Sequence, residues 1–429
     1  MAEYIDKIVI DGVEHDLKDS RLTQEVSQLA QVVSQLIGGG DIFPKHRFMT
    51  FGFSDSNHKS VKIAAGTTLE LPITEDGNTV REFLRITEDT EFDLSSDMTT
   101  AANAASTRTG EENGRDYYVY LAPDTEGVKL VASLNDTAPS DIDESYTTSN
   151  TRKIGQFHTL CVDAGATLTG LIPADLGSLA VNDYTLVKNV SEDSDFYDFY
   201  NRKVTAVSSN AIYDTVTVEH VLKGFTAGQI LPESVWCLSF RPNSKADGMV
   251  YDPETDTAVD IYLQSGKGRN TKSVYGGTTI RTRQQENHQA DMRAVGKLLI
   301  SDSEFTSAAL GSNEKTAIYG AAESSIISTG GHVDTTSRRM VSFIGAEDMC
   351  GGVWQWLRDV CANGGTNFTT YDGVGNFGQT FGTSNALLAG GSWNNGASCG
   401  SRCRHATLAR SDASANLGGR GVSRVVRGV

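Results

Sequence analysis

Residues 390–425 read GGSWNNGASCGSRCRHATLARSDASANLGGRGVSRV and combine a repeated frame with unlike side chains. Glycine, alanine and arginine recur through the stretch, which has neither the alternation of a half-buried strand nor the 3.6-residue stripe of an amphipathic helix. Interleaved arginines, Trp393 and the closing strand-like GVSRVV argue against a disordered end. The residues between the frame positions differ in size, charge and polarity: Asn394, Asn395, Ser398, Cys403, His405, Thr407, Leu408, Asp412, Ser414 and Asn416.

The composition of the whole chain predicts a multidomain protein that is rich in β-structure. With 429 residues it is too long for one ordinary core, so about two to four domains are expected. Plentiful glycine (43) and scarce proline (8), with many Ser, Thr, Asn and Asp residues, favour short strands and turns. A net charge of −17 argues against a nucleic-acid partner, because phosphate binding needs a basic surface.

The chain shows no targeting or membrane signal. Residues 1–16 lack a basic region followed by an apolar core, so we expect no signal peptide. No run of about 18 apolar residues occurs, so we expect no membrane insertion. The cysteines are too few for a disulfide scaffold and lack paired CxxC zinc spacing, which predicts reduced and mostly buried thiols: Cys161, Cys237, Cys350, Cys361, Cys399 and Cys403.

Residues 1–40 are predicted to form an oligomerisation segment. Alternating residues around Asp11-Gly12 indicate a β-hairpin. A helix with about two coiled-coil heptads follows, and residues 38–40 (Gly-Gly-Gly) end it as a hinge. One amphipathic helix packed on its own domain remains an alternative. The spacing of four, three, four and three residues that defines the coiled coil belongs to Leu22, Val26, Leu29, Val33 and Leu36.

Short apolar runs separated by polar turns predict two β-rich regions, 41–150 and 151–245. His158 and Cys161 have an H-x-x-C spacing, but without a second pair nearby we interpret them as buried strand residues. In 246–429, Asp252, Glu254 and Asp256 offer oxygen ligands for calcium. The sharp-turn glycine of a calcium loop is missing, which favours an acidic solvated turn.

Residues 301–311 predict one clear helix in the C-terminal region. Ser301 and Glu304 form an S-x-x-E capping box, Phe305 lies on the apolar face, and Gly311 follows as the stop. Further on, Trp354 and Trp356 stand in an apolar run and are expected in the core.

These pieces occur in an order that resembles the C-type lectin fold in its formylglycine-generating-enzyme branch. The resemblance rests on Glu304-Phe305, on 353–356 (VWQW), on 390–393 (GGSW) and on 421–425 (GVSRV), and covers roughly the last 150 residues. It implies an α+β C-type lectin fold for 246–429, behind a mainly β N-terminal part with a short coiled coil.

Two subfamilies with this scaffold differ in function. One is a copper oxidase with two active-site cysteines near the chain end, to which Cys399 and Cys403 are comparable, since thiolates suit copper(I). The spacing of these cysteines departs from the enzyme, and Cys403 stands among the variable-looking residues.

The other subfamily comprises variable receptor-binding proteins of phages and bacteria, of the major tropism determinant type, diversified by a diversity-generating retroelement. The stalk-like N-terminus resembles phage tail fibres, which favours this subfamily over the oxidase. The resemblance implies a non-enzymatic, usually trimeric virion protein, made in the host cytoplasm, which contacts tail or baseplate proteins through its N-terminus and a bacterial cell-surface receptor, protein or glycan, through its C-terminal domain.

In that reading the ten unlike residues of 390–425 form the ligand-binding surface and no cofactor is required. A glycan-binding lectin without diversification stays an alternative. The residues expected to hold the loop backbone are Gly390, Gly391, Trp393, Arg402, Arg404, Arg410, Arg420 and Arg424.

Overall fold

The computed structural model divides the chain into two units, 1–47 and 48–429, which are considered separately. The predicted coiled coil and glycine hinge lie outside the described residues. The structure describes residues 7–10, 13–16, 49–52, 58–75, 78–94, 113–124, 127–164, 167–173, 204–209, 213–219, 222, 224–362, 368–373, 376–381 and 384–428.

In the first unit, β1 (Lys7–Ile10) pairs antiparallel with β2 (Val13–Asp16). Ile10 lies opposite Val13, so the strands join across residues 11 and 12. This confirms the hairpin that the Asp11-Gly12 signal predicts.

The second unit begins with small sheets. Strands β3 (Met49–Gly52), β4 (Ser60–Ile63) and β7 (Thr90–Asp93) form one three-stranded sheet, and β5 (Thr68–Glu75) pairs with β6 (Asn78–Arg85). A second three-stranded sheet has the order β11 (Thr167–Pro173), β13 (Tyr213–Glu219), β12 (Val204–Ser209).

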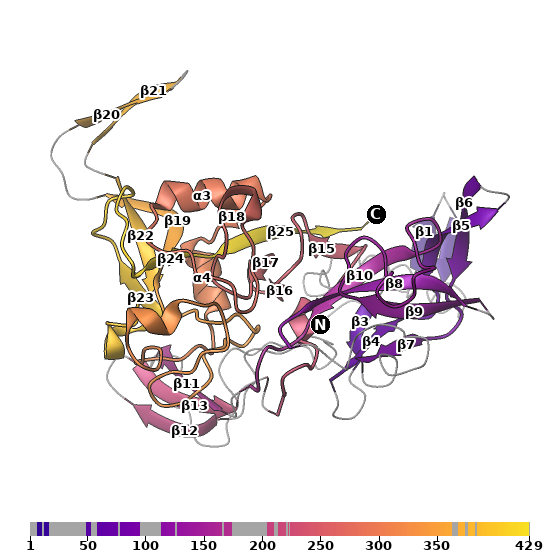
Figure 1. Cartoon of the computed structure of the whole chain (residues 1–429), viewed down its shortest axis with the longest axis horizontal. Helices are drawn as coiled ribbons and strands as arrows, with labels where there is room; N and C mark the ends of the chain where they lie inside the picture. The colour runs from indigo at the N-terminus through magenta and orange to yellow at the C-terminus, as the bar shows by residue number, and fades with distance from the viewer. Residues whose placement is uncertain are drawn as a thin grey trace. The chain divides into compact units, whose positions relative to one another are not determined.

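One nine-stranded sheet connects segments that are far apart in the sequence (Figure 1). The terminal strand β25 pairs with β17 on one side and with β15 and β18 on the other. Strands from 41–150, 151–245 and 246–429 therefore share one sheet, and the predicted boundaries between these regions remain predictions. Its members are β16 (Met249–Asp252), β17 (Thr257–Asp260), β25 (Gly421–Arg427), β15 (Phe240–Pro242), β14 (Trp236–Cys237), β10 (Arg152–His158), β8 (Asp116–Asp124), β9 (Gly127–Ser133) and β18 (Leu298–Leu299).

A four-stranded sheet contains the two strands that lie within residues 391–419. Its order is β23 (Gly400–His405), β22 (Ser384–Gly390), β19 (Trp354–Ala362), β24 (Leu417–Gly419). Between β19 and β22 the chain forms a separate hairpin of β20 (Phe368–Gly373) and β21 (Asn376–Phe381), which projects from this sheet in Figure 1.

Among the described residues, α3 (Gln285–Ala294) and α4 (Asp302–Ala308) are the α-helices that accompany these strands. Both halves of the predicted capping box are present at α4: Ser301 Oγ accepts from Glu304 N, and the Glu304 carboxylate accepts from Ser301 N. Trp354 and Trp356 are buried in one apolar cluster, as predicted. Short 3₁₀ turns complete the region: η2 (Pro232–Ser234), η3 (Gly268–Asn270), η4 (Glu323–Ile326) and η5 (Gly396–Ser398).

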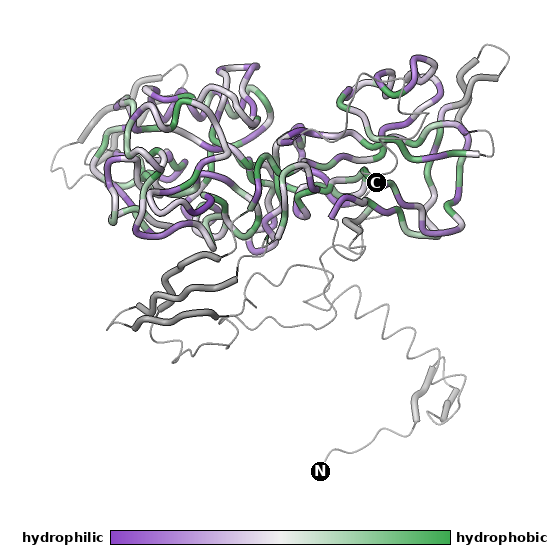
Figure 2. Tube along the Cα trace, turned by 60° about the horizontal axis from the view of Figure 1, so that its bottom comes forward, coloured by the Kyte–Doolittle hydropathy of each residue, from purple (hydrophilic) through white to green (hydrophobic). Residues whose placement is uncertain are grey.

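Hydrophobic and hydrophilic residues alternate over short distances along the chain (Figure 2). Among the described helices, none is both long and apolar enough to span a bilayer.

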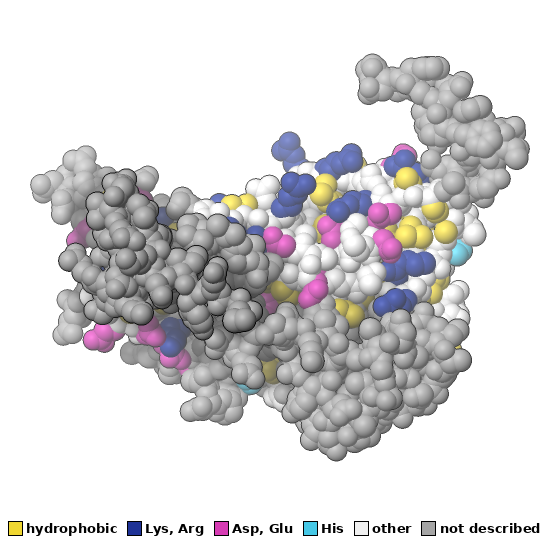
Figure 3. Space-filling view, turned by 180° about the vertical axis from the view of Figure 1, so that it is seen from behind, with side chains coloured by type: hydrophobic (Ala, Val, Ile, Leu, Met, Phe, Trp, Pro, Cys, Tyr) yellow, Lys and Arg dark blue, Asp and Glu magenta, His cyan; other side chains and the backbone are white. Residues whose placement is uncertain are grey.

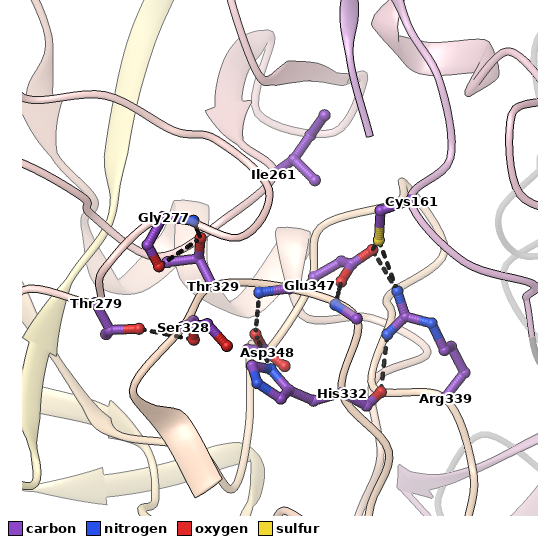
Figure 4. Close-up of polar contacts among 12 residues, drawn as sticks. Cys161, Ile261, Gly277, Thr279, Ser328, Thr329, His332, Arg339, Glu347 and Asp348 are labelled. Atoms are coloured by element: carbon purple, nitrogen blue, oxygen red, sulfur yellow. Dashed lines mark hydrogen bonds and ion pairs between the residues drawn. The ribbon is translucent and has the colours of Figure 1, made fainter. Parts of the chain in front are cut away.

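A buried polar cluster supports the loops at 330–348 (Figure 4). Arg339 pairs with Glu347 at 2.6 Å, and the Cys161 thiol donates to the same carboxylate at 3.0 Å. Arg339 Nη1 donates to the carbonyl of His332, whose ring Nδ1 lies 2.8 Å from Asp348 Oδ2. Burial raises the pKa of Cys161, so this thiol stays protonated at neutral pH. His158 is a buried residue of β10, as predicted, whereas Cys161 is buried but lies after the strand, in a bend.

Candidate functional site

The candidate site is the segment between β22 and β24, which we call the displayed segment (residues 391–416). It crosses the four-stranded sheet, because β23 pairs with β22 on one edge while β24 runs parallel to β19 on the other. Both ends of the segment are therefore fixed by main-chain hydrogen bonds to the same sheet. Positions along it are set by the fold, whatever side chains they carry.

Arg420, just after β24, is the most constrained of the predicted frame residues. It is fully buried, and its Nε donates to Gln355 Oε1 at 2.9 Å. Nη1 donates to the carbonyls of Asp260 (2.6 Å) and Ile261 (2.7 Å), and Nη2 donates to the carbonyl of Glu347. Burial lowers the pKa of Arg420 to about 10, which still leaves it charged at neutral pH. One side chain thus ties the end of the displayed segment to the nine-stranded sheet and to the buried polar cluster.

At the other end, Gly390 and Gly391 make the turn out of β22. Both have positive φ, +90° and +80°, which a residue with Cβ rarely adopts. A Cβ on Gly390 would lie 2.4 Å from the Met349 carbonyl oxygen, and one on Gly391 would lie 2.7 Å from Cys399 Sγ. Glycine is needed at both positions for the turn and for close packing.

Trp393 is half-buried against an apolar cluster, with the Arg281 guanidinium 5.9 Å from its ring centroid. Arg281 also donates to the carbonyl of Ala415 at 3.3 Å and pairs with Glu323 at 3.2 Å. This arginine supports both halves of the displayed segment. Sequence reasoning missed it, since no local motif connects residue 281 with the chain end.

Arg404 and Arg410 fasten the segment to the two helices. Arg404 forms an ion pair with Asp302, donates to Thr306 Oγ1 at 2.7 Å and lies over the Phe305 ring of α4. Arg410 donates to Gln285 Oε1 of α3 at 2.8 Å.

The predicted frame residues Arg402 and Arg424 are exposed instead. Arg402 lies near the buried Glu314, whose carboxylate accepts from the backbone N (3.0 Å) and side chain of Ser401. Glu314 is a second support that the sequence did not reveal. Arg424 belongs to β25, where its backbone pairs with Thr257.

The predicted displayed residues fall into two groups by burial. One group is exposed to solvent: Asn394, Ser398, Thr407 and Ser414. The other group is half-buried: Asn395, Cys403, His405, Leu408, Asp412 and Asn416.

Several half-buried members also stabilise the segment. Asn395 Oδ1 accepts from the backbone N of Ser392 at 2.9 Å, and Asp412 Oδ2 accepts from Ala409 N at 2.9 Å. Both contacts close local turns. Cys403 and Leu408 pack against the apolar cluster that contains the two tryptophans.

His405 lies between the core and the surface. Its ring stands 5.4 Å from the Trp354 ring, and Nε2 lies 2.9 Å from Thr407 Oγ1. Its Nδ1 is buried and has no hydrogen-bond partner within the described part of the chain. Nearby, the Ala406 carbonyl accepts from Asn385 Nδ2 at 3.0 Å and contacts Cys361 Sγ at 3.5 Å. The end of β19 therefore borders the displayed segment.

The two cysteines compared with the oxidase are poor thiolates. Cys399 is buried, and burial first, then the neighbouring Cys403 and Glu314 charges, raise its pKa to about 12. Burial also raises the pKa of Cys403. Since copper(I) binds the thiolate, this environment opposes metal loading at neutral pH.

The acidic residues near 252–256 do not converge on one point. Buried Asp252 accepts from Ser307 Oγ (3.0 Å) and Thr255 Oγ1 (2.8 Å), whereas Asp256 forms an ion pair with Arg427. Their oxygens thus serve internal contacts, and Asp252 is not part of a solvated turn as the sequence suggested. In the described ranges, no group of three or more His, Cys, Asp or Glu side chains is arranged to hold a metal.

Known proteins resemble this chain in sequence over one region and in fold over most of its length. Residues 53–185 match the sequence family described as "Mtd second domain". The solved Major Tropism Determinant U1 variant is 22% identical with a TM-score of 0.56, over 89% of this chain and 84% of that one. The I1 variant is likewise 22% identical, with a TM-score of 0.57 over the same shares. The P3c variant is 21% identical, with a TM-score of 0.57, covering 89% of this chain and 84% of that one.

No curated protein matches the chain by sequence. The structural matches confirm the resemblance drawn from the C-terminal motifs, and at these identities they establish likeness of fold. The mainly β architecture with few helices is confirmed as well.

Proposed function

We propose that this protein is a phage tail receptor-binding protein whose C-terminal C-type lectin domain binds a bacterial cell-surface receptor through the displayed segment. The observation that carries the proposal is that different residues within 390–425 hold the fold and face the solvent. Arg420, Gly390 and Gly391 serve the fold, while Ser398, Thr407 and Ser414 expose small hydroxyl side chains to solvent. The likeness to major tropism determinant variants, whose name refers to tropism, supports it.

A fixed backbone with changeable side chains lowers the entropic cost of binding, as loops on an immunoglobulin scaffold do. The exposed side chains here are small, so one copy binds weakly. Several copies on a virion, in a trimer or on several fibres, add avidity. In this proposal the chain is a virion component, attached through its N-terminal residues to tail or baseplate proteins, and it is not an enzyme.

We further propose that a diversity-generating retroelement varies the displayed positions. A Tyr codon accounts for Cys403, and an unchanged Asn codon accounts for Asn416. Single or double adenine changes in an Asn codon account for the others: Ser398, His405, Thr407, Leu408, Asp412 and Ser414. The test is the flanking DNA. A reverse-transcriptase gene and a near-identical adenine-rich template repeat are expected, and their absence contradicts diversification without touching receptor binding.

Receptor binding is tested with the full chain, fluorescently labelled, on a panel of Gram-negative and Gram-positive strains. Ser398→Glu with Ser414→Glu adds bulk and charge at exposed positions and should abolish binding to any strain that binds the wild type. The control, Thr68→Glu with Ser149→Glu, adds the same charge at exposed positions outside 246–429. Equal binding by both double variants, with unchanged circular dichroism, would show that the displayed segment is not the receptor site.

The copper oxidase is the second candidate, and the raised pKa values of Cys399 and Cys403 weigh against it. Copper-dependent oxygen consumption by the purified chain would support it.

A further inference from the structure

A closed loop of residues 265–272, which we call the basic loop, carries three exposed cations. Lys267, Arg269 and Lys272 all face solvent. In the parts of the chain that the structure describes, no ion pair joins any of them to a carboxylate. Most other arginines near the displayed segment bond to protein groups, so these three differ in being available to a ligand.

The backbone of the basic loop is rigid. Ser265 and Lys272 exchange two main-chain hydrogen bonds, of 2.9 and 2.8 Å. Gly266 has φ +74°, and a Cβ there would lie 2.0 Å from the Asn270 carbonyl oxygen. In the middle of the loop, Gly268 N donates to Asp291 Oδ1 of α3 at 2.8 Å. A ligand would therefore bind cations whose backbone is already ordered, which limits the entropic cost.

The buried carboxylate beneath the loop does not neutralise these cations. Asp291 is already paired with Arg283, whose Nε and Nη2 lie 2.7 and 2.8 Å from its oxygens, and it also accepts from Gln264 Nε2. The neighbouring His288 is buried and neutral: burial, and after it the charge of Arg283 with a smaller effect of Lys267, lowers its pKa to about 3.

The charge of this region is opposite to that of the chain. Residues 264–297 hold seven Lys and Arg against two Asp and Glu, in a chain whose net charge is −17. On the face shown in Figure 3, Lys and Arg side chains lie among Asp and Glu side chains. A positive region on an acidic protein concentrates polyanions from solution and speeds their encounter.

Residues on either side of the basic loop contact the displayed segment and the strand that follows it. Gln264, which immediately precedes it, donates its backbone N–H to the Gly419 carbonyl of β24 at 2.9 Å. Thr282 N donates to the Ser414 carbonyl at 3.0 Å, so the chain that leaves the basic loop returns to the displayed segment.

We propose that the basic loop is a second attachment site, which binds an acidic cell-surface polysaccharide with repeated carboxylate or phosphate groups. The inference rests on the proposed host attachment and adds a step to it. The cations hold the polymer without reading its sequence, and the displayed segment then supplies specificity. Because the contacts are exposed, binding weakens as ionic strength rises.

The test uses the purified full chain and three probes: polygalacturonate, long-chain inorganic polyphosphate and neutral dextran. The two anionic probes separate carboxylate from phosphate recognition. The wild type should bind at least one anionic probe, more weakly at physiological than at low salt, and should not bind dextran. Lys267→Gln with Arg269→Gln and Lys272→Gln should weaken that binding about tenfold at low salt.

The matched control removes the same charge from other exposed positions: Arg85→Gln, Arg241→Gln and Arg424→Gln. Equal loss in both triple variants would reduce the effect to net charge and overturn the site, as would unchanged binding by the basic-loop variant or binding of dextran. If polymer binding fails while strains are still bound through Ser398 and Ser414, only the basic-loop proposal falls. If polymer binding holds but no strain is bound, the basic loop stands and the proposed function falls.

Discussion

Replacing Arg420 tests whether the residues that hold the backbone of the site differ in role from the residues displayed on its surface. Arg420→Met keeps most of the side-chain volume but removes every donor. The Gln355 amide oxygen and the buried carbonyls of Asp260 and Glu347 lose the Arg420 donor, as does the Ile261 carbonyl, which keeps its bond from Glu347 N. A buried acceptor left without its donor costs about 1 to 3 kcal/mol, and removing one partner of a buried charged network costs about 3 to 5 kcal/mol. We therefore expect the free energy of unfolding to fall by about 4 kcal/mol.

Tryptophan fluorescence during urea unfolding measures this change where it matters, because three of the four tryptophans, Trp354, Trp356 and Trp393, lie in 246–429. With a slope of about 2 kcal/mol per molar urea, the midpoint should fall by about 2 M. Arg420→Lys should recover only part of the loss, since an ammonium on a flexible stem cannot reproduce the fixed fork of guanidinium donors that reaches four acceptors.

Arg424→Met is the matched control, four residues along the chain and exposed on β25. A surface change of this kind is expected to stay within about 0.5 kcal/mol. If Arg420→Met shifts the midpoint no more than Arg424→Met does, Arg420 does not organise the frame and the division between frame and display fails.

Two further predictions concern titratable groups. Cys399, whose pKa is raised to about 12, should resist iodoacetamide in the native chain at pH 7.5 and react fully in urea, as mass spectrometry of the labelled peptide would report; rapid native labelling would restore the copper-oxidase reading. Burial raises the pKa of Asp252 to about 6, so the folded state binds this proton more tightly than the unfolded state, and its contribution to stability is full below pH about 4 and is lost as pH rises through 6. The urea midpoint of Asp252→Asn should therefore change less between pH 4 and 7 than that of the wild type, by up to about 3 kcal/mol in the free energy of unfolding. The same pH dependence in both proteins would contradict the raised pKa.

Local signals in the sequence were sufficient for the elements that local contacts define. The capping box at Ser301, the hairpin at residues 7–16, the burial of Trp356 and the closing strand all follow from short-range patterns and are present. The pairing of β25 with β15 and β17 is different, because it joins residues more than 150 positions apart. Nothing in a strand's own sequence states which distant strand it will pair with. Domain boundaries predicted from local composition therefore take no account of strands that pair across them.

The candidate site shows the same limit at single residues. Gly390 and Gly391 could be assigned to the frame from sequence, because a glycine pair before a loop indicates positive φ. Arg281 and Glu314 could not, since each reaches the displayed segment from an unrelated part of the chain. Arg402 was assigned to the frame by its place among other arginines, but its side chain is exposed. Residue type alone does not distinguish a buried structural arginine from an exposed one.

The burial of the displayed residues also sets how much each can vary. At the exposed positions Ser398, Thr407 and Ser414, almost any side chain should cost less than about 0.5 kcal/mol of stability. Cys403 and Leu408 contact the apolar cluster, where a larger or charged residue costs about 1 to 3 kcal/mol. If these positions are all diversified, the half-buried ones must either be restricted to residues that the core tolerates or rely on the stability reserve that the frame supplies. The four hydrogen bonds of Arg420 are thus a condition for variation at the surface as well as for folding, because a weaker frame would leave fewer viable variants.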